Sequence, residues 1–220
     1  MRILEIHPVD ECDLPALTRI FYAGFTTAID QQMFPDTPGL RAWWADANRH
    51  DILHKPGVRF LKVIDRFITP AGSDVGNGDG DDDSDSNSNN AGNNENVISY
   101  AKWDLDPSNR GRRFPEWHPD SDAELCDRFF GGCDLVHKEI MDGRGHYYLD
   151  MLVTHPAHQR RGAATMLVRW GCNLADETGM SVYIDATRAG APVYEMMGFV
   201  VVREDAEAGL LSMVREPMGV

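Results

Sequence analysis

The chain has 220 residues, of which 42% are hydrophobic and 25% are charged, and its formal net charge is −14 at pH 7. This length is enough for one well-filled core and short for two, so we expect residues 1–220 to form a single domain. A surface this acidic argues against the phosphate backbone of nucleic acid as the main partner. A small-molecule amine or a basic peptide is a better match.

Cysteine and histidine spacing indicates no structural metal. The four cysteines stand apart without C-x-x-C spacing, and the eight histidines form no H-E-x-x-H motif. No apolar run reaches the ~18 residues that a membrane span needs, and the first ten residues lack the apolar core of a signal peptide. These features predict a cytoplasmic protein with reduced thiols and no membrane segment, and they leave the oligomeric state open.

The amino-terminal part of the chain predicts a strand followed by two helices. Residues 2–6 alternate as a strand, and Asp13 with Pro15 in the next turn is typical of a helix start. Residues 38–53 form a second helical pattern that carries Trp43 and Trp44. We expect at least one of these tryptophans to lie in the core.

Residues 59–69 and 97–105 predict two strands of a hairpin, separated by an acidic segment. Residues 71–96 hold seven acids, no Lys or Arg, and one apolar residue larger than Ala, Val75. Such a composition cannot bury enough surface to offset the ordering entropy, so we expect a disordered acidic insertion at the hairpin tip.

The same segment shares part of the pattern of a calcium-binding loop. Asp79, Asp81 and Asp83 stand at alternate positions, as in an EF-hand loop. The sixth position is then Ser84 rather than Gly, and the twelfth is Asn90 rather than Glu. The pattern therefore fails, and a solvated acidic linker is the better interpretation.

Residues 106–145 predict an insertion that borders the substrate. Ser121 and Glu124 have the spacing of a capping box for a helix that carries Phe129 and Phe130. Two glycines at 131 and 132 are expected to end this helix, and a second helical piece follows. The alternative is a solvated structural appendage.

The stretch from residue 146 to residue 178 predicts a strand, a tight loop and a helix. Within the strand, Leu149, Met151 and Val153 alternate with a second set of residues, which are Tyr148, Asp150, Leu152 and Thr154. Pro156 ends the ladder, and apolar residues return at helical spacing from residue 163 to residue 178. Gly179 is expected to close the helix.

The loop has the features of a phosphate site. It places unpaired N–H groups, the positive end of a helix and two guanidinium groups together, which favours phosphate oxygens and above all a diphosphate. The loop residues are Gln159, Arg160, Arg161, Gly162, Ala163 and Ala164. The alternative is a plain strand-to-helix connection with solvated arginines.

The order of these residues resembles the acyl-CoA-binding motif Q/R-x-x-G-x-G/A of the GNAT family of N-acetyltransferases. It stands here as residues 159–164, with Ala164 at the final position. Residues 181–187 and the segment 191–199, which contains Y-E-x-x-G-F, look like the next strand and helix of that family. The resemblance implies an α/β fold with a mixed, mainly antiparallel sheet of about six or seven strands and about four helices. Residues 199–204 and 210–215 would form the closing strands.

The same resemblance implies an activity, a cofactor and site residues. The activity is acetyl-CoA-dependent transfer of an acetyl group to an amine, which makes the protein an acyltransferase. The backbone of Leu152, Val153 and Thr154 would bind pantetheine and polarise the thioester, and residues 159–164 would bind the diphosphate. Tyr194 would protonate the leaving thiolate, and the alternative is that its ring simply packs against Phe199 or the cofactor.

Asp150 is the candidate general base, with a hydrogen-bonded structural role as the alternative. His155 is a weaker candidate, because a His before Pro in a connecting loop is usually exposed. Two rival functions stay open: an acyltransferase with another acyl chain or acceptor, and a non-catalytic CoA-binding or protein-interaction module.

Overall fold

The computed structural model describes residues 2–67, 96–108, 111–206 and 208–219. They form a seven-stranded sheet in the order β1-β2-β3-β4-β5-β7-β6. The strands are β1 (Arg2–Pro8), β2 (Val58–Phe67), β3 (Val97–Asp104), β4 (His146–Thr154), β5 (Ser181–Thr187), β6 (Val200–Asp205) and β7 (Leu210–Arg215). Neighbouring strands are antiparallel except β4 and β5, which are parallel. The predicted α/β fold with a mixed, mainly antiparallel sheet is confirmed.

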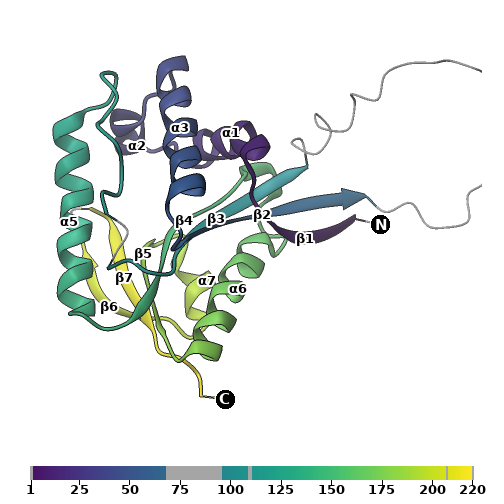
Figure 1. Cartoon of the computed structure of the whole chain (residues 1–220), viewed down its shortest axis with the longest axis vertical. Coiled ribbons are helices and arrows are strands. Elements are labelled where there is room, and N and C mark those ends of the chain that lie inside the picture. Colours follow the sequence, from purple (N-terminus) through teal and green to yellow (C-terminus); the bar gives the residue numbers. More distant parts are fainter. Residues whose placement is uncertain (1, 68–95, 109–110, 207, 220) are drawn as a thin grey trace, which may run out of the picture.

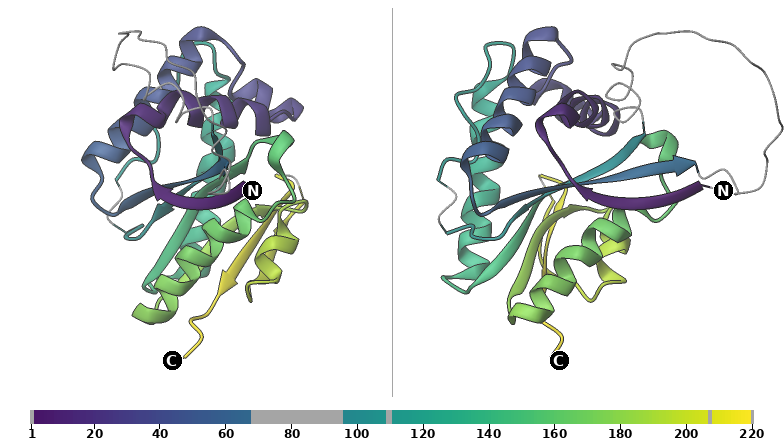
Figure 2. Two further views of the ribbon diagram at one scale, coloured as in Figure 1. Left: turned by 90° about the vertical axis from the view of Figure 1, so that its right-hand side faces the viewer. Right: turned by 45° about the vertical axis from the view of Figure 1, so that its right-hand side comes forward.

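Six α-helices in the described residues cover the two faces of this sheet. They are α1 (Leu14–Gly24), α2 (Ala28–Met33), α3 (Pro38–His54), α5 (Ala123–Met141), α6 (Ala163–Thr178) and α7 (Ala191–Glu195). In Figure 1, α1, α2 and α3 lie above the sheet and α6 lies below it. The right-hand view of Figure 2 shows the sheet between these two groups.

The larger hydrophobic cluster lies between the sheet and α6. Trp103 of β3 is fully buried there, together with Leu167 and Val182. A Cβ atom at Gly171 would lie 2.3 Å from the Trp103 ring, so glycine allows α6 to approach the sheet closely. As predicted, the helix ends after Thr178, and Gly179 takes a left-handed φ of 70°.

Aromatic side chains fill the opposite face. Trp44 is 3% exposed and stacks on Phe21 with ring centroids 3.9 Å apart. Phe34 and Phe114 belong to the same buried cluster. The prediction that at least one tryptophan of α3 lies in the core is confirmed by Trp44.

The predicted hairpin is also confirmed. β2 and β3 pair from Val58↔Asp104 to Ile64↔Val97. The predicted disordered insertion at 71–96 lies outside the described residues, apart from Asn96, whose carbonyl accepts the N–H of Asp65.

The start of α1 differs from the prediction. Asp13 precedes α1 but makes no side-chain cap there. Asp10 instead caps the preceding 3-10 turn Glu11–Asp13. The carboxylate of Asp13 is paired with Lys62 of β2, and this buried ion pair replaces the predicted cap.

The segment before β4 also differs. α5 is one continuous helix of 19 residues, so Gly131 and Gly132 do not end it, and Asp122 rather than Ser121 caps it. Two interior glycines cost about 1 kcal/mol each. Packing at the two ends of α5, where Cys126 and Met141 are buried, outweighs that local preference.

A β-bulge changes the faces of β4. The β3–β4 register shifts so that Lys102 pairs with Met151 and Trp103 pairs with Leu149, which leaves Asp150 as the extra residue. Leu149 and Leu152 consequently pack with α6, whereas Met151 and Val153 pack toward α1. The prediction that Leu149, Met151 and Val153 share a face is wrong, and so is the prediction that Asp150 shares one with Leu152. Simple alternation fails because one inserted residue reverses it.

Candidate active site

β4 and β5 pair only at their amino ends and then separate. The parallel ladder contains His146↔Ser181, Tyr147↔Val182 and Tyr148↔Tyr183. Both strands continue, β4 to Thr154 and β5 to Thr187. Beyond Tyr148, the side of β4 that faces β5 therefore has no ladder partner among the described strands.

The backbone of β4 presents hydrogen-bonding groups along this open side. The N–H of His155 donates to Ile98, and the carbonyl of Val153 accepts a hydrogen bond from Ser99. The groups of residues 153 and 155 thus face β3. Because successive residues of a strand point their backbone groups to opposite sides, those of Leu152 and Thr154 face the opening.

The chain passes from β4 through a short 3-10 turn, Pro156–His158, into the loop before α6. Gly162 precedes the helix with φ 90°, and no side chain caps the first turn. Arg160, Arg161 and Gly162 are exposed. The first N–H groups of a 16-residue helix therefore open onto an accessible loop, which is the arrangement that binds anions.

Arg161 links this loop to β2. Its Nη1 lies 2.8 Å from Oδ2 of Asp65, and Arg2 lies 3.0 Å from the same oxygen. The Arg161 guanidinium holds the pKa of the Asp65 carboxyl below its usual range, although burial opposes this effect. Arg161 is therefore held beside the helix end, and Arg160 extends from the neighbouring position.

Tyr194 lies on α7, which follows β5 after a turn closed by Gly190. It is 6% exposed, and its ring lies 5.7 Å from that of Phe199 at 65°. Burial raises the pKa of Tyr194 well above its ordinary value, so its hydroxyl is neutral at working pH. Tyr194 and Leu152 contribute to the same apolar cluster. The ring packs against Phe199. The role of the Tyr194 hydroxyl as proton donor stays a prediction.

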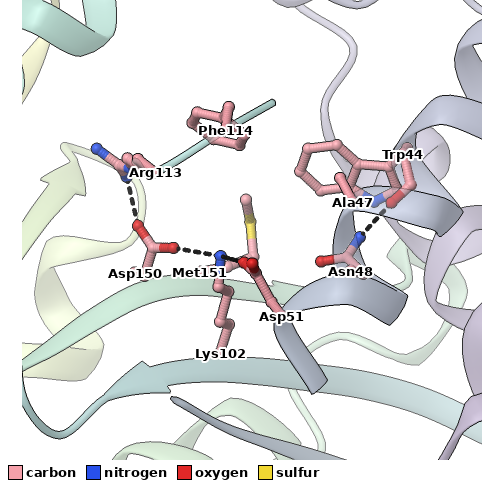
Figure 3. A pocket seen from close by; sticks show the side chains of 9 residues that line it. All are labelled: Trp44, Ala47, Asn48, Asp51, Lys102, Arg113, Phe114, Asp150 and Met151. Atoms are coloured by element: carbon pink, nitrogen blue, oxygen red, sulfur yellow. Dashed lines mark hydrogen bonds and ion pairs between the residues drawn. The ribbon is translucent and has the colours of Figure 1, made fainter. Parts of the chain in front are cut away.

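Asp150 lies in a buried network of charges, which Figure 3 shows. Arg113 Nη2 is 2.6 Å from Asp150 Oδ1, and Lys102 Nζ is 2.9 Å from Asp150 Oδ2. Lys102 also lies 2.7 Å from Asp51 of α3. Burial alone would lower the pKa of Lys102, but the charges of Asp150 and Asp51 outweigh it and raise the pKa.

This network lines a cavity of about 10 Å³, room for roughly one water molecule. Trp44, Phe114 and Met151 supply its apolar wall. Each oxygen of Asp150 contacts a cation, which is the structural role that the sequence left open for this residue.

Sequence reasoning did not find Lys102, Arg113 or Asp51. One signal was available for Lys102, since it stands in a run of residues that are otherwise mostly apolar, Val97–Asp104, and the whole strand is buried. A Lys inside such a strand needs a buried carboxylate. The residues that pair with it come from distant parts of the chain and cannot be read from the local pattern.

Comparison with known proteins finds a family that matches the segment carrying this site. A family model described as the acetyltransferase (GNAT) family matches residues 95–199. That range contains the strand pair that separates, the phosphate-type loop, α6 and α7. The part of the chain that builds this site, residues 95–199, belongs to the GNAT acetyltransferase family.

The similarity of this chain to one curated acetyltransferase covers only part of either protein. An acetyltransferase of Stachybotrys chartarum is 31% identical over 90 residues, which are 39% of this chain and 38% of that protein. The match therefore spans well under half of the relative's length.

Solved structures share the fold along nearly the whole chain. The histone acetyltransferase HPA2 and related acetyltransferase of Corynebacterium glutamicum superposes with a TM-score of 0.55 at 18% identity, covering 98% of this chain and 97% of that one. The PaiA N-acetyltransferase of Thermoplasma acidophilum, solved in complex with coenzyme A, gives 0.52 at 10% identity, covering 97% and 99%. At these identities the likeness shows the GNAT fold alone.

In the described part of this GNAT chain, no helix is both long and apolar enough to cross a membrane.

Proposed function

We propose that this chain transfers an acetyl group from acetyl-CoA to an amine acceptor. The observation that carries the proposal is the continuity of the open side of β4 with the uncapped start of α6. One short stretch of chain thus offers backbone groups for an extended amide-containing arm and, at its end, N–H groups and arginines for a diphosphate. Coenzyme A has this chemistry, and the related Thermoplasma acidophilum protein binds it.

In this proposal residues 159–164 hold the diphosphate, and the open backbone groups of Leu152 and Thr154 hold pantetheine. Val153 completes this stretch of β4, with its own carbonyl directed to β3. An N–H on the open side of β4 polarises the thioester carbonyl, because a fixed donor stabilises the charge that develops on that oxygen. Tyr194 supplies the proton that the leaving thiolate needs.

Asp150, the base that the sequence predicts, already neutralises two cations. Its contacts with Lys102 and Arg113 favour a role in holding that network together rather than in removing a proton. Arg113 and Phe114 reach the cavity from the segment 106–145, which supports a substrate-side position for that segment.

Calorimetry with CoA, followed by thiol release from acetyl-CoA, tests the proposal. Spermidine, 2-phenylethylamine and a lysine-containing peptide are suitable acceptor probes, and propionyl-CoA tests the acyl chain. We expect CoA to bind and at least one amine to stimulate thiol release. Binding without release for any amine would favour the non-catalytic CoA-binding module, and absence of binding would remove the proposal.

A further inference from the structure

The last paired residues of β4 and β5 are two tyrosines, and each is followed by an aspartate at the same offset. Tyr148 pairs with Tyr183, and Asp150 and Asp185 stand two residues further along the separating strands. Both tyrosines pack under Met141 of α5. Asp150 and Asp185 therefore flank the start of the opening on the face that α5 covers.

The two aspartates have different surroundings. Asp150 contacts two cations, and its side chain is 6% exposed. Asp185 is only half-buried, and within the described ranges no Lys, Arg or His lies within ion-pair distance of it. Its carboxylate accepts hydrogen bonds from three hydroxyl groups: Tyr183 at 2.6 Å, Tyr148 at 3.1 Å and Ser212 at 3.1 Å. Asp185 is thus an oriented carboxylate whose charge no cation neutralises by contact.

Burial raises the pKa of Asp185 above its ordinary value, against the hydrogen bonds of Tyr183, Ser212 and Tyr148 and the more distant charge of Arg113. The facing group on α5 is Cys133, whose own pKa is raised to about 12 by burial and by Asp185, so it is a neutral thiol at working pH. The hydroxyl groups from β4, β5 and β7 are neutral as well. A carboxylate with a raised pKa is a better proton acceptor near neutral pH.

We propose that Asp185 accepts the proton of the acceptor amine, an inference that rests on the proposed acetyl transfer. The acceptor enters as an ammonium ion and gives one proton to the Asp185 carboxylate. The freed nitrogen lone pair forms the C–N bond to the thioester carbon, and the C–S bond breaks with its electron pair going to sulfur. The thiolate takes a proton from Tyr194, and the nitrogen, which is cationic once the C–N bond has formed, loses a second proton that restores the Tyr194 hydroxyl. Asp185 returns the first proton to solvent, to which it is partly exposed.

Ser212, Tyr183 and Tyr148 are positioning residues in this scheme. The Ser212 hydroxyl donates to Oδ1 of Asp185, and its oxygen lies 3.1 Å from the Tyr183 hydroxyl oxygen. Its bond favours the ionised carboxylate, so its removal should raise the pKa of Asp185 further.

The experiment measures kcat, KM and the pH dependence of kcat/KM with acetyl-CoA and whichever of spermidine, 2-phenylethylamine and the lysine peptide the wild type acetylates fastest. Asp185→Asn should lower kcat by about 100-fold or more, because positioned bases contribute at least that much. It should also abolish the acid limb of the profile while leaving acetyl-CoA affinity unchanged. Ser212→Ala should keep turnover at high pH and move the acid limb to higher pH.

The matched control is Asp176→Asn on α6. Asp176 binds Arg215 at 2.7 and 2.8 Å, so this variant also removes a structural carboxylate and should lower the melting temperature. Its acid limb should stay where the wild type has it. If Asp185→Asn does not fold, the shift in Ser212→Ala decides the question.

Two failures are distinguishable. Wild-type protein that acetylates none of the amines would overturn the proposed function and this inference together. Wild-type turnover in Asp185→Asn, or an unmoved acid limb in folded Ser212→Ala, would overturn the inference alone.

Discussion

The two sides of the opening between β4 and β5 are built on different principles. On the side proposed for CoA, the groups come from one continuous stretch, residues 152–164, and are mainly backbone N–H and C=O groups. On the α5 side the groups are side chains. Asp51 comes from α3, Lys102 from β3, Asp150 from β4 and Asp185 from β5.

Backbone groups can be the same in many related sequences, whereas a network of buried side chains is particular to one chain. Backbone groups need only a strand, a glycine and a helix start, so many sequences build the same phosphate site. A buried side-chain network depends on specific partners that meet only after folding. The side proposed for CoA therefore uses groups that many sequences can supply, and the charged side depends on side chains particular to this chain.

Gly162→Glu should have the largest effect, because it acts on the backbone-built side. Its carboxylate would stand at the anion site and oppose the diphosphate. Charge-assisted hydrogen bonds contribute about 1.5–3 kcal/mol each, so the loss of two should lower CoA affinity about 10³-fold. Calorimetry with CoA and with dephosphorylated pantetheine measures the change, and pantetheine should be affected much less.

Gly162→Ala is the matched control. Gly162 has φ 90°, so any side chain there is strained, but a Cβ atom would meet nothing within 4 Å. Both variants share the backbone strain, of about 1–2 kcal/mol, and only Glu adds the charge. Equal CoA affinity in the two folded variants would contradict a diphosphate at this loop.

Lys102→Met tests the side of the opening that is built from side chains, through its effect on the free energy of unfolding. The variant leaves Asp51 and Asp150 buried without their shared cation, and breaking a buried pair in this way costs about 3–5 kcal/mol. Arg203→Met is the control, since its ion pair with Glu139 is exposed and should contribute under about 1 kcal/mol. Urea unfolding of both variants measures the free energies of unfolding.

The pH dependence of this loss has a defined sign. The pKa of Lys102 is raised in the folded chain above its ordinary value of 10.5. The contribution of Lys102 is therefore fully present below pH 10.5 and is lost as pH rises through the folded pKa. The stability difference between wild type and Lys102→Met should be constant near neutral pH and shrink in strong alkali. A difference that already disappears at pH 8 would mean that the pair is not held as the structure shows it.

The sequence predicted most of the fold and the elements of the side proposed for CoA, which are the end of β4, the loop and α6, because the relevant patterns are local. The strand before Pro156, the loop around Gly162 and the helix end at Gly179 all lie within one short stretch. The bulge at Asp150 could not be predicted, since one inserted residue depends on pairing with β3. The continuous α5 could not be predicted either, because packing of Met141 and Cys126 outweighs the glycines.

The α5 side was missed for a related reason. Asp150 was recognised from its place in the strand, but its neighbours Lys102 and Arg113 are separated from it by dozens of residues. Asp185 gave no motif of its own. Its significance comes from the hydroxyl groups that surround it after three strands have paired.

Tyr194→Phe probes the position where the two sides meet. The variant keeps the ring against Phe199 and removes only the hydroxyl. Positioned proton donors contribute about 100-fold or more to kcat. Burial raises the pKa of Tyr194 and makes it a weaker acid, so we expect a fall at or below the lower end of that range, about 100-fold. Steady-state kinetics should show a lower kcat with unchanged acetyl-CoA affinity. Wild-type kcat across the pH range would assign Tyr194 to packing and the proton to water.

Excision of residues 72–94 should have the smallest effect and tests whether the acidic insertion belongs to either side. The removed residues hold six acids and no Lys or Arg, so the net charge would change from −14 to −8. Their composition offers almost no apolar surface to bury, and β2 and β3 pair directly up to Ile64↔Val97. A short turn should therefore close the hairpin with little change in melting temperature, CoA affinity or transfer to 2-phenylethylamine.

Transfer to the lysine-containing peptide is the sensitive measurement, because loss of negative charge weakens attraction of a cationic acceptor most at low ionic strength. Peptide turnover that falls at low salt while amine turnover holds would make the insertion a recognition element of the acceptor side, and a large fall in melting temperature would show that it packs against the domain.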